Sequence, residues 1–216
     1  GRSYVLTARL APLQVRAAAA AGVRALSVYA FSTENWARPE GEVAFLLALL
    51  ERALRTELAE LKAEGVCVSI VGDTSRMPPA LAAAAASAAA ETEGNDRLHL
   101  LVAVGYGGRQ ELAAAAARLA ARVERGEMGA SEVDEAALEA ELSTSAALPE
   151  GLREPDLLIR TSGEMRLSNF MLWQSAYTEL YFTDTLWPDF GEEELHRALD
   201  EYSARQRRFG ERRDRL

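Results

Sequence analysis

Short apolar runs alternate with longer helical segments along most of this chain. The runs are rich in strand-forming residues and are four to seven residues long: Ala25–Phe31, Val66–Val71, Leu98–Val104 and Leu157–Arg160. Strands that are apolar throughout, rather than on alternate residues, are typical of parallel sheets buried on both faces. The alternation therefore predicts an α/β fold with a central, mostly parallel sheet covered by helices on both faces.

The segments between these runs carry helix signals. Apolar residues recur at helical spacing over Glu42–Glu64, and Gly65 ends that segment. No Gly/Ser-rich or Pro-rich linker interrupts the chain, so a single domain over residues 1–216 is expected. The other expected elements are a helix from Pro78-Pro79 to near Gly94, a helix over Arg109–Arg125, an acidic helix after the capping-box-like Ser131-Glu-Val-Asp134, a short helix near 169–177, a strand over Glu179–Phe182, and a last helix from a cap at Asp189 to about Arg208.

The charge balance restricts the class of ligand. The chain of 216 residues has a formal net charge of -9, which argues against general nucleic-acid binding. An anionic substrate would need local arginines set against that charge. The single cysteine, Cys67, lies in a strand-like run, which favours a small buried apolar role. No stretch of 18 or more apolar residues is present, so no transmembrane segment is expected.

The loop after the first strand is rich in polar groups. Ser32-Thr-Glu-Asn-Trp-Ala-Arg38 offers a hydroxyl, an amide, an indole and a guanidinium within seven residues. Ligands of open parallel sheets bind at the carboxyl ends of strands, and arginine holds phosphate oxygens through paired hydrogen bonds. Taken alone, however, this loop is better read as a helix entry, with Trp36 packing and Arg38-Pro39 forming a turn.

The loop after the fourth strand gives a stronger indication of an anion site. In Arg160-Thr-Ser-Gly-Glu-Met-Arg-Leu-Ser168, two arginines flank a Ser-Gly turn, and Ser168 is expected to begin a helix. Free N–H groups at a helix N-terminus, next to two guanidinium groups, suit an anion such as a phosphate. This spacing favours a functional interpretation over two ordinary surface arginines.

Glu179 follows within an otherwise apolar segment, Tyr177–Phe182. A buried, unpaired carboxylate costs several kcal/mol, so this one needs a partner. Magnesium bound to a diphosphate takes only one or two protein carboxylates, and Glu179 fits that role. A structural ion pair with Arg160 or Arg166 explains the sequence equally well.

Several established motifs are missing. The chain has no G-x-x-x-x-G-K-[ST] loop and no G-x-S-x-G, and Gly105-Tyr-Gly-Gly108 is read as a tight turn rather than a dinucleotide site. Its two histidines, His99 and His196, lack the spacing of metal ligands.

The two polar loops together resemble the cis-prenyltransferase family, which includes undecaprenyl and dehydrodolichyl diphosphate synthases. The resemblance runs from about Gly22 to Gly210 and rests on motifs that occur in order. They are Tyr29–Pro39, Gly72–Arg76, Gly105–Arg109, Asp156–Phe170, Leu172–Gln174, Glu179–Phe182 and Trp187–Phe190.

The resemblance implies an enzyme that condenses isopentenyl diphosphate onto an allylic, often farnesyl, diphosphate, with magnesium as cofactor. A homodimer is implied, a heterodimer is the alternative, and the lipid product is compatible with peripheral attachment to a membrane. No compartment is implied. Carried over by motif, Arg160, Arg166 and Ser168 would hold isopentenyl diphosphate, Glu179 would join the magnesium site, and Ser32, Asn35, Trp36 and Arg38 would position the reacting ends of the substrates.

Two further assignments rest on the resemblance alone. Val43, Phe45, Leu46, Leu47 and Leu50 would line a tunnel for the growing chain, although any core helix carries such a stripe. Arg208-Phe-Gly210 resembles the family's R-x-G ending, which reaches the partner subunit's site and contacts diphosphate; the alternative is a solvated, arginine-rich helix end.

One family feature is missing from the chain. The family's N-terminal strand carries an Asp-Gly-Asn motif whose aspartate belongs to the metal site, but residues 1–21 contain no aspartate, histidine or asparagine. The expectation is that the protein extends upstream of Gly1 and that this N-terminal strand lies there. The alternative is a non-catalytic partner subunit of a heteromeric enzyme.

Overall fold

Three parallel strands form the main sheet of the computed structural model, which describes residues 14–206. Strand β3 (Leu98–Tyr106) lies between β1 (Ala25–Ser32) and β2 (Val66–Val71). Ala25 of β1 pairs with His99, and Val66 of β2 pairs with Leu98. Because all three strands run the same way, the polar loops that follow them emerge at one edge of the sheet.

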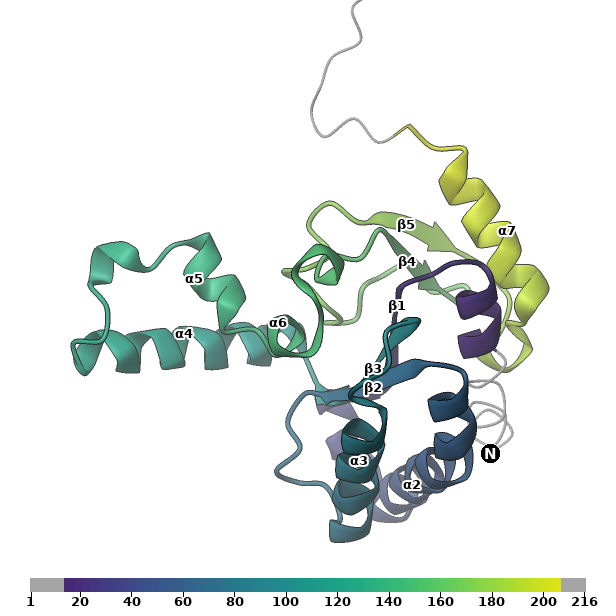
Figure 1. Ribbon diagram of the computed structural model, residues 1–216, viewed down its shortest axis with the longest axis horizontal. Coiled ribbons are helices and arrows are strands. Elements are labelled where there is room, and N and C mark those ends of the chain that lie inside the picture. The colour runs from purple at the N-terminus through teal and green to yellow at the C-terminus, as the bar shows by residue number, and fades with distance from the viewer. Residues whose placement is uncertain (1–13, 207–216) are drawn as a thin grey trace, which may run out of the picture.

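Two helices cover one face of this sheet (Figure 1). They are α2 (Glu40–Ala63) and α3 (Pro79–Thr92), close to the predicted segments. Residues 14–20 are also helical and contribute Val15 and Ala18 to the same core. The core residues of this layer include Leu47, Leu54 and Leu61 of α2, Leu81 and Ala88 of α3, and Leu98, Leu100 and Val102 of β3. Burial of this apolar surface is the main contribution to folding stability.

Shorter segments cover the opposite face of the sheet. Leu101 and Ala103 of β3 alternate with the residues of the first core and pack with Leu148 and Met171. Ala147 of the short helix α6 (Ser143–Ala147) and Leu152 of the turn η3 (Glu150–Leu152) pack against this second cluster. The predicted cover on both faces is therefore confirmed, with short elements rather than long helices on the second face.

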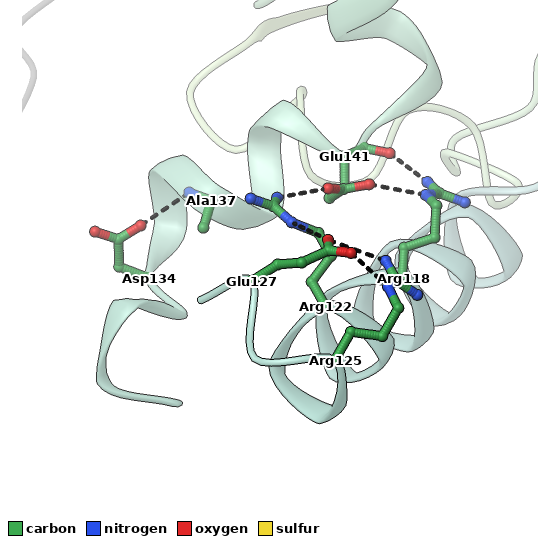
Figure 2. Close-up of polar contacts among 7 residues, drawn as sticks. All are labelled: Arg118, Arg122, Arg125, Glu127, Asp134, Ala137 and Glu141. Atoms are coloured by element: carbon green, nitrogen blue, oxygen red, sulfur yellow. Dashed lines mark hydrogen bonds and ion pairs between the residues drawn. The ribbon is translucent and has the colours of Figure 1, made fainter. Parts of the chain in front are cut away.

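Helix α4 (Gly108–Glu124) runs away from the sheet, and α5 (Glu135–Ala140) lies alongside it (Figure 1). The carboxylate of Glu141 accepts hydrogen bonds from Arg118 Nε at 3.0 Å and Arg122 Nη1 at 2.9 Å, which tie α5 to α4 (Figure 2). Asp134 caps α5 by accepting a hydrogen bond from the Ala137 N–H at 2.8 Å. The acidic helix expected after Ser131 is present, but it begins at Glu135 with Asp134 rather than Ser131 as its N-cap, because Ala130–Glu132 forms the 3-10 turn η2.

A second, separate sheet contains β4 (Leu157–Arg160) and β5 (Glu179–Phe182), which pair in parallel. The expected single sheet is thus divided in two. Helix α7 (Glu192–Ser203) follows, and Glu194 accepts a hydrogen bond from the Gly191 N–H at 3.2 Å. Asp189 is not the cap, because it belongs to the turn η4 (Trp187–Asp189).

Within residues 14–206, no helix combines the length and the apolar character needed to cross a membrane.

Candidate functional site

The loop after β1 forms one side of the candidate site. It folds as the 3-10 turn η1 (Thr33–Ala37), and the side chain of Asn35 accepts a hydrogen bond from the Ser32 N–H at 3.1 Å. Arg38 forms an ion pair with Glu42 at 3.0 Å across the first turn of α2. These contacts give Asn35 and Arg38 structural tasks that hold the shape of the loop.

Trp36 packs on two sides. Its ring meets Phe31 edge-on at 4.8 Å between centroids, and the guanidinium of Arg76 lies 4.2 Å from the centre of the Trp36 ring. A cation over an indole face is attracted by the ring quadrupole. Arg76 follows β2, so this contact brings a further cation to the same edge of the sheet; the sequence analysis names Arg76 only as the end of the motif Gly72–Arg76 and gives it no role in the site.

Arg160 lies at the carboxyl end of β4 and has an unsatisfied hydrogen-bond donor. Its Nε is buried and has no hydrogen-bond partner among residues 14–206. A buried donor without a partner is costly, and a guanidinium is suited to a phosphate oxygen. An anionic ligand would satisfy this group.

Tyr29 connects Arg160 to the loop after β1. Burial raises the pKa of Tyr29 to about 12 and the charge of Glu34 adds to the rise, whereas Ser32 and Arg160 act in the opposite direction. The phenol therefore stays protonated near neutral pH, and its hydroxyl contacts the Tyr106 carbonyl at 3.0 Å and the Ser168 carbonyl at 3.5 Å. The structure thus brings Ser32, Arg160 and Ser168 near one half-buried tyrosine.

The segment after Arg160 differs from its prediction. Ser168, Asn169 and Met171 have positive φ values of 51°, 63° and 43°, and residues 169–177 form turns. The short helix expected near 169–177 is therefore wrong, and so is an anion site at its N-terminus. A residue in the left-handed region cannot continue a right-handed helix. Arg166 is 63% exposed and pairs with Glu164.

Asn169 joins this segment to two other loops, a role that the sequence analysis missed. Its Oδ1 accepts a hydrogen bond from the Arg109 N–H at 2.9 Å, and its Nδ2 donates to Glu34 and to Gln110, each at 3.0 Å. Its carbonyl also accepts a hydrogen bond from the Gly108 N–H at 2.7 Å. The one available signal was the residue type, since asparagine is enriched at positive φ.

The glycine turn after β3 gives these loops room to meet. A side chain at Gly107 would place its Cβ 2.4 Å from Gln110 Oε1, 2.6 Å from Thr33 Oγ1 and 2.7 Å from Asn169 Nδ2. The reading of Gly105–Gly108 as a tight strand-to-helix turn is confirmed, with close packing between loops as its reason.

Glu179 lies at the opposite end of its strand pair from Arg160. It begins β5 and pairs with Leu157, whereas Arg160 pairs with Phe182 at the other end of the ladder. Three residues of strand separate the backbone positions by about 10 Å. Glu179 forms an ion pair with Arg205, at 3.0 Å between Oε2 and Nη1. The predicted alternative, an ion pair with Arg160 or Arg166, therefore named the wrong partner.

The predicted tunnel residues share one helix but not one environment. Leu47 is buried in the core, and Val43, Leu46 and Leu50 pack partly buried against it. Phe45 lies off this stripe and is 47% exposed. Arg208 and Gly210 lie outside the described residues.

Comparison with known proteins places the chain among similar sequences and structures. A family model described as "Putative undecaprenyl diphosphate synthase" matches residues 8–210. An isoprenyl transferase of Geobacillus kaustophilus is 51% identical over 189 residues, which are 88% of this chain and 72% of the relative. Dehydrodolichyl diphosphate synthase 2 of Arabidopsis thaliana is 48% identical over 88% of this chain and 60% of its own length.

A solved structure shares the fold. The crystal structure of lavandulyl diphosphate synthase from Lavandula x intermedia, in complex with dimethylallyl diphosphate, superposes with a TM-score of 0.92 at 39% identity. The match covers 96% of this chain and 87% of the other.

Proposed function

The chain belongs to the undecaprenyl diphosphate synthase family of prenyltransferases, and on this basis we propose that it elongates cis-prenyl chains. The proposed reaction condenses isopentenyl diphosphate onto an allylic diphosphate of the farnesyl type. A carbon–carbon bond forms between the two isoprenoid units, the carbon–oxygen bond of the allylic diphosphate breaks and releases inorganic diphosphate, and the isopentenyl unit loses a proton. The observation that carries the proposal within this chain is the buried, unpartnered Nε of Arg160 at a strand end.

The proposed role of the arginines is to hold and orient the diphosphate that is retained in the product. Arg160 would donate to it from the carboxyl end of β4, with Arg166 and Ser168 on the same loop. Ser32, Asn35, Trp36 and Arg38 would place the two reacting carbons from the loop after β1. Holding two reactants in contact replaces a bimolecular encounter by a unimolecular step, which is a large part of catalysis.

Magnesium is proposed as a companion of the substrate diphosphate. Within residues 14–206, no group of three or more His, Cys, Asp or Glu side chains is placed to hold a metal ion, and Glu179 is engaged with Arg205. These residues therefore do not form a metal site on their own. Glu179 would reach a metal only by exchanging its arginine partner. Thermal unfolding with magnesium and isopentenyl diphosphate tests this: E179Q should lose the metal-dependent part of the shift, whereas E201Q, which removes the other partner of Arg205, should keep it.

Three further parts of the proposal follow from the family. The stripe of α2 from Val43 to Leu50, together with Phe45, would contact the growing isoprenoid. Arg208 and Gly210 would contact diphosphate. The enzyme would act as a homodimer, and its apolar product would favour contact with a membrane surface.

Isothermal titration with isopentenyl diphosphate tests the arginine site directly. R160Q should raise the Kd at least about tenfold, as the loss of a charged hydrogen bond to a buried partner predicts. R166A should weaken binding in the same direction. R52Q, at an exposed arginine of α2, is the matched control and should leave the Kd unchanged. Equal affinity of R160Q and R52Q would contradict the assignment.

Incubation of the complete protein with farnesyl diphosphate, labelled isopentenyl diphosphate and magnesium tests the reaction. Products that lengthen by one isoprene unit at a time are expected. A folded protein that binds isopentenyl diphosphate but forms product only with an added active partner would instead be a non-catalytic subunit.

A further inference from the structure

The loop after β2 approaches the loop after β1 at the end of the three-stranded sheet. The Asp73 N–H donates a hydrogen bond to the Gly105 carbonyl, near the end of β3, at 3.2 Å. Gly105 has a φ of 61°, and a Cβ there would lie 2.5 Å from the Asp73 carbonyl oxygen and 3.5 Å from Trp36 Nε1. Because glycine occupies this position, both loops can pack against the end of β3.

Local hydrogen bonds fix the backbone on both sides of Arg76. The Ser75 N–H donates to Asp73 Oδ1 at 2.9 Å, and the Met77 N–H donates to the Thr74 carbonyl at 3.0 Å. The side chain of Met77 is buried in the main core. Arg76 therefore extends from a well-defined turn, although its own side chain is exposed.

The indole of Trp36 is held by two different elements. Phe31 of β1 is 2% exposed and meets the ring edge-on, and the guanidinium of Arg76 lies over the ring at 4.2 Å from its centre. Among residues 14–206, Arg76 forms no hydrogen bond and no ion pair. The Trp36 ring is therefore the group that its guanidinium directly contacts in this range.

We propose that Arg76 is a positioning residue for prenyl transfer and that it acts by holding the Trp36 ring in place. This inference rests on the proposed function, in which Trp36 helps to place the reacting carbons. A planar guanidinium stacks on an indole and is attracted by the ring quadrupole. Without Arg76, one side of the indole loses its support and other rotamers of Trp36 become accessible. A misplaced orienting group slows a reaction between two bound substrates.

Acrylamide quenching of tryptophan fluorescence tests the contact in the unliganded protein. The chain has three tryptophans, so the Trp36 signal is obtained as the difference between each protein and the same protein carrying W36F. R76Q should make the Trp36 signal easier to quench, and R76K should restore part of the protection because an ammonium group also binds a ring face. R52Q, at an exposed arginine of α2, should match the wild type. Equal quenching of Trp36 in R76Q and the wild type would overturn the proposal.

Steady-state elongation of farnesyl diphosphate by the complete protein tests the consequence. R76Q should lower kcat about fivefold, the factor expected from loss of one cation–π contact, and R76K should recover part of it. The KM for isopentenyl diphosphate should stay unchanged, because the loop after β4 is proposed to hold that substrate. The unfolding temperature of R76Q should stay near that of the wild type, since an exposed arginine without an ion pair contributes little to stability.

A double-mutant cycle tests whether Arg76 acts through Trp36. In a W36L background, R76Q should have little further effect on kcat. The same loss from R76Q in both backgrounds would mean that Arg76 acts on the substrate directly, and the proposal would be wrong. The quenching and the comparison of R76Q with R52Q decide the matter even if W36L is too slow to assay.

The outcomes separate this inference from the proposed function. If the wild type elongates farnesyl diphosphate and R76Q is as fast as R52Q, the positioning role of Arg76 is wrong and the proposed function stands. If the wild type forms no product, the proposed function is wrong and the positioning role falls with it, whatever the quenching shows of the contact.

Discussion

The side chain of Asn169 links all three loops of the candidate site. It hydrogen-bonds to Glu34 after β1, to Arg109 and Gln110 after β3, and it lies on the segment that follows β4. Its backbone is in the left-handed region at φ 63°. Because these contacts set the position of Ser168 relative to Ser32, Asn169 is a positioning residue rather than a catalytic one.

Replacing Asn169 by glycine should separate positioning from folding. Glycine tolerates the positive φ, so only the side-chain hydrogen bonds are lost. The matched control is N95G, which removes two hydrogen bonds from Asn95 to the Lys62 and Val66 carbonyls, far from the site in sequence. Each variant should lose on the order of 1 kcal/mol of stability. Only N169G should lower kcat/KM, by about tenfold or more, as expected when reacting groups are misplaced. Similar kinetics for both variants would refute the role.

Tyr29 predicts a loss of stability in alkaline solution. Its folded pKa is raised to about 12 from 10.0, because burial and the charge of Glu34 disfavour the phenolate. Between these values the unfolded chain releases the proton while the folded chain keeps it, so stability falls as the pH rises. Urea unfolding at pH 8 and pH 11 should show a smaller loss for Y29F than for the wild type. Y177F, at a tyrosine that is 72% exposed, should behave as the wild type does.

At the scale of single residues, the sequence predicts which side chains belong to the candidate site better than it predicts which groups they contact. Ser32 and Arg160 were expected at strand ends and do lie near Tyr29, as does Ser168, although the helix that Ser168 was expected to begin is absent. Asn169 and Arg76 lie within motifs of the family resemblance, but nothing local predicts their contacts, since those come from other loops. The partner of Glu179 could not be foreseen either, because it depends on where the end of α7 lies.

Among the elements, the helices with a clear apolar period match their predicted bounds within a few residues. The segment near 169–177 fails because three non-glycine residues with positive φ break any helix, and tertiary contacts rather than local propensity impose those angles. The division into two sheets was not foreseeable from strand patterns, which do not specify pairing. The arrangement of α5 beside α4 likewise depends on side-chain contacts between them.

Glu141 is the main polar link between α4 and α5. Hydrogen bonds from Arg122 and then Arg118 hold the pKa of Glu141 below its ordinary value of 4.5. E141Q should therefore destabilise the chain at pH 7 by on the order of 1 kcal/mol. E127Q, which removes the exposed partner of Arg125 in the same region, should change stability little (Figure 2). A depressed pKa contributes stability above the unfolded value, and that contribution is lost as the pH falls through the folded value. The difference between E141Q and the wild type should thus shrink on acidification, measured by urea unfolding from pH 7 to pH 3.

At the scale of the whole molecule, the candidate site is a junction between two sheets. Ser32–Arg38 belongs to the three-stranded sheet, and Arg160–Ser168 belongs to β4 and β5. The turn after β4 is also held by the turn after β5, since the Ser162 and Gly163 N–H groups donate to the Thr185 and Thr183 carbonyls at 2.9 and 3.0 Å. A ligand bound between these loops would join two units that also meet through side-chain packing and through the hydrogen bonds of Asn169 and Tyr29.

Hydrogen exchange should reveal whether isopentenyl diphosphate bridges both sheets. If it contacts both loops, exchange of exposed amides in residues 32–38 and in residues 160–168 should slow together. At a ligand concentration of ten times the Kd, the slowing should approach about tenfold where exchange requires the free state. Peptides from residues 118–141, in α4 and α5, lie away from the site and serve as the internal control (Figure 1). In N169G the protection of residues 32–38 should weaken more than that of residues 160–168, because the link between the loops is cut while the arginines remain. Protection confined to residues 160–168 in the wild type would show that the ligand contacts one sheet alone, and the positioning role of Ser32, Asn35, Trp36 and Arg38 would then be wrong.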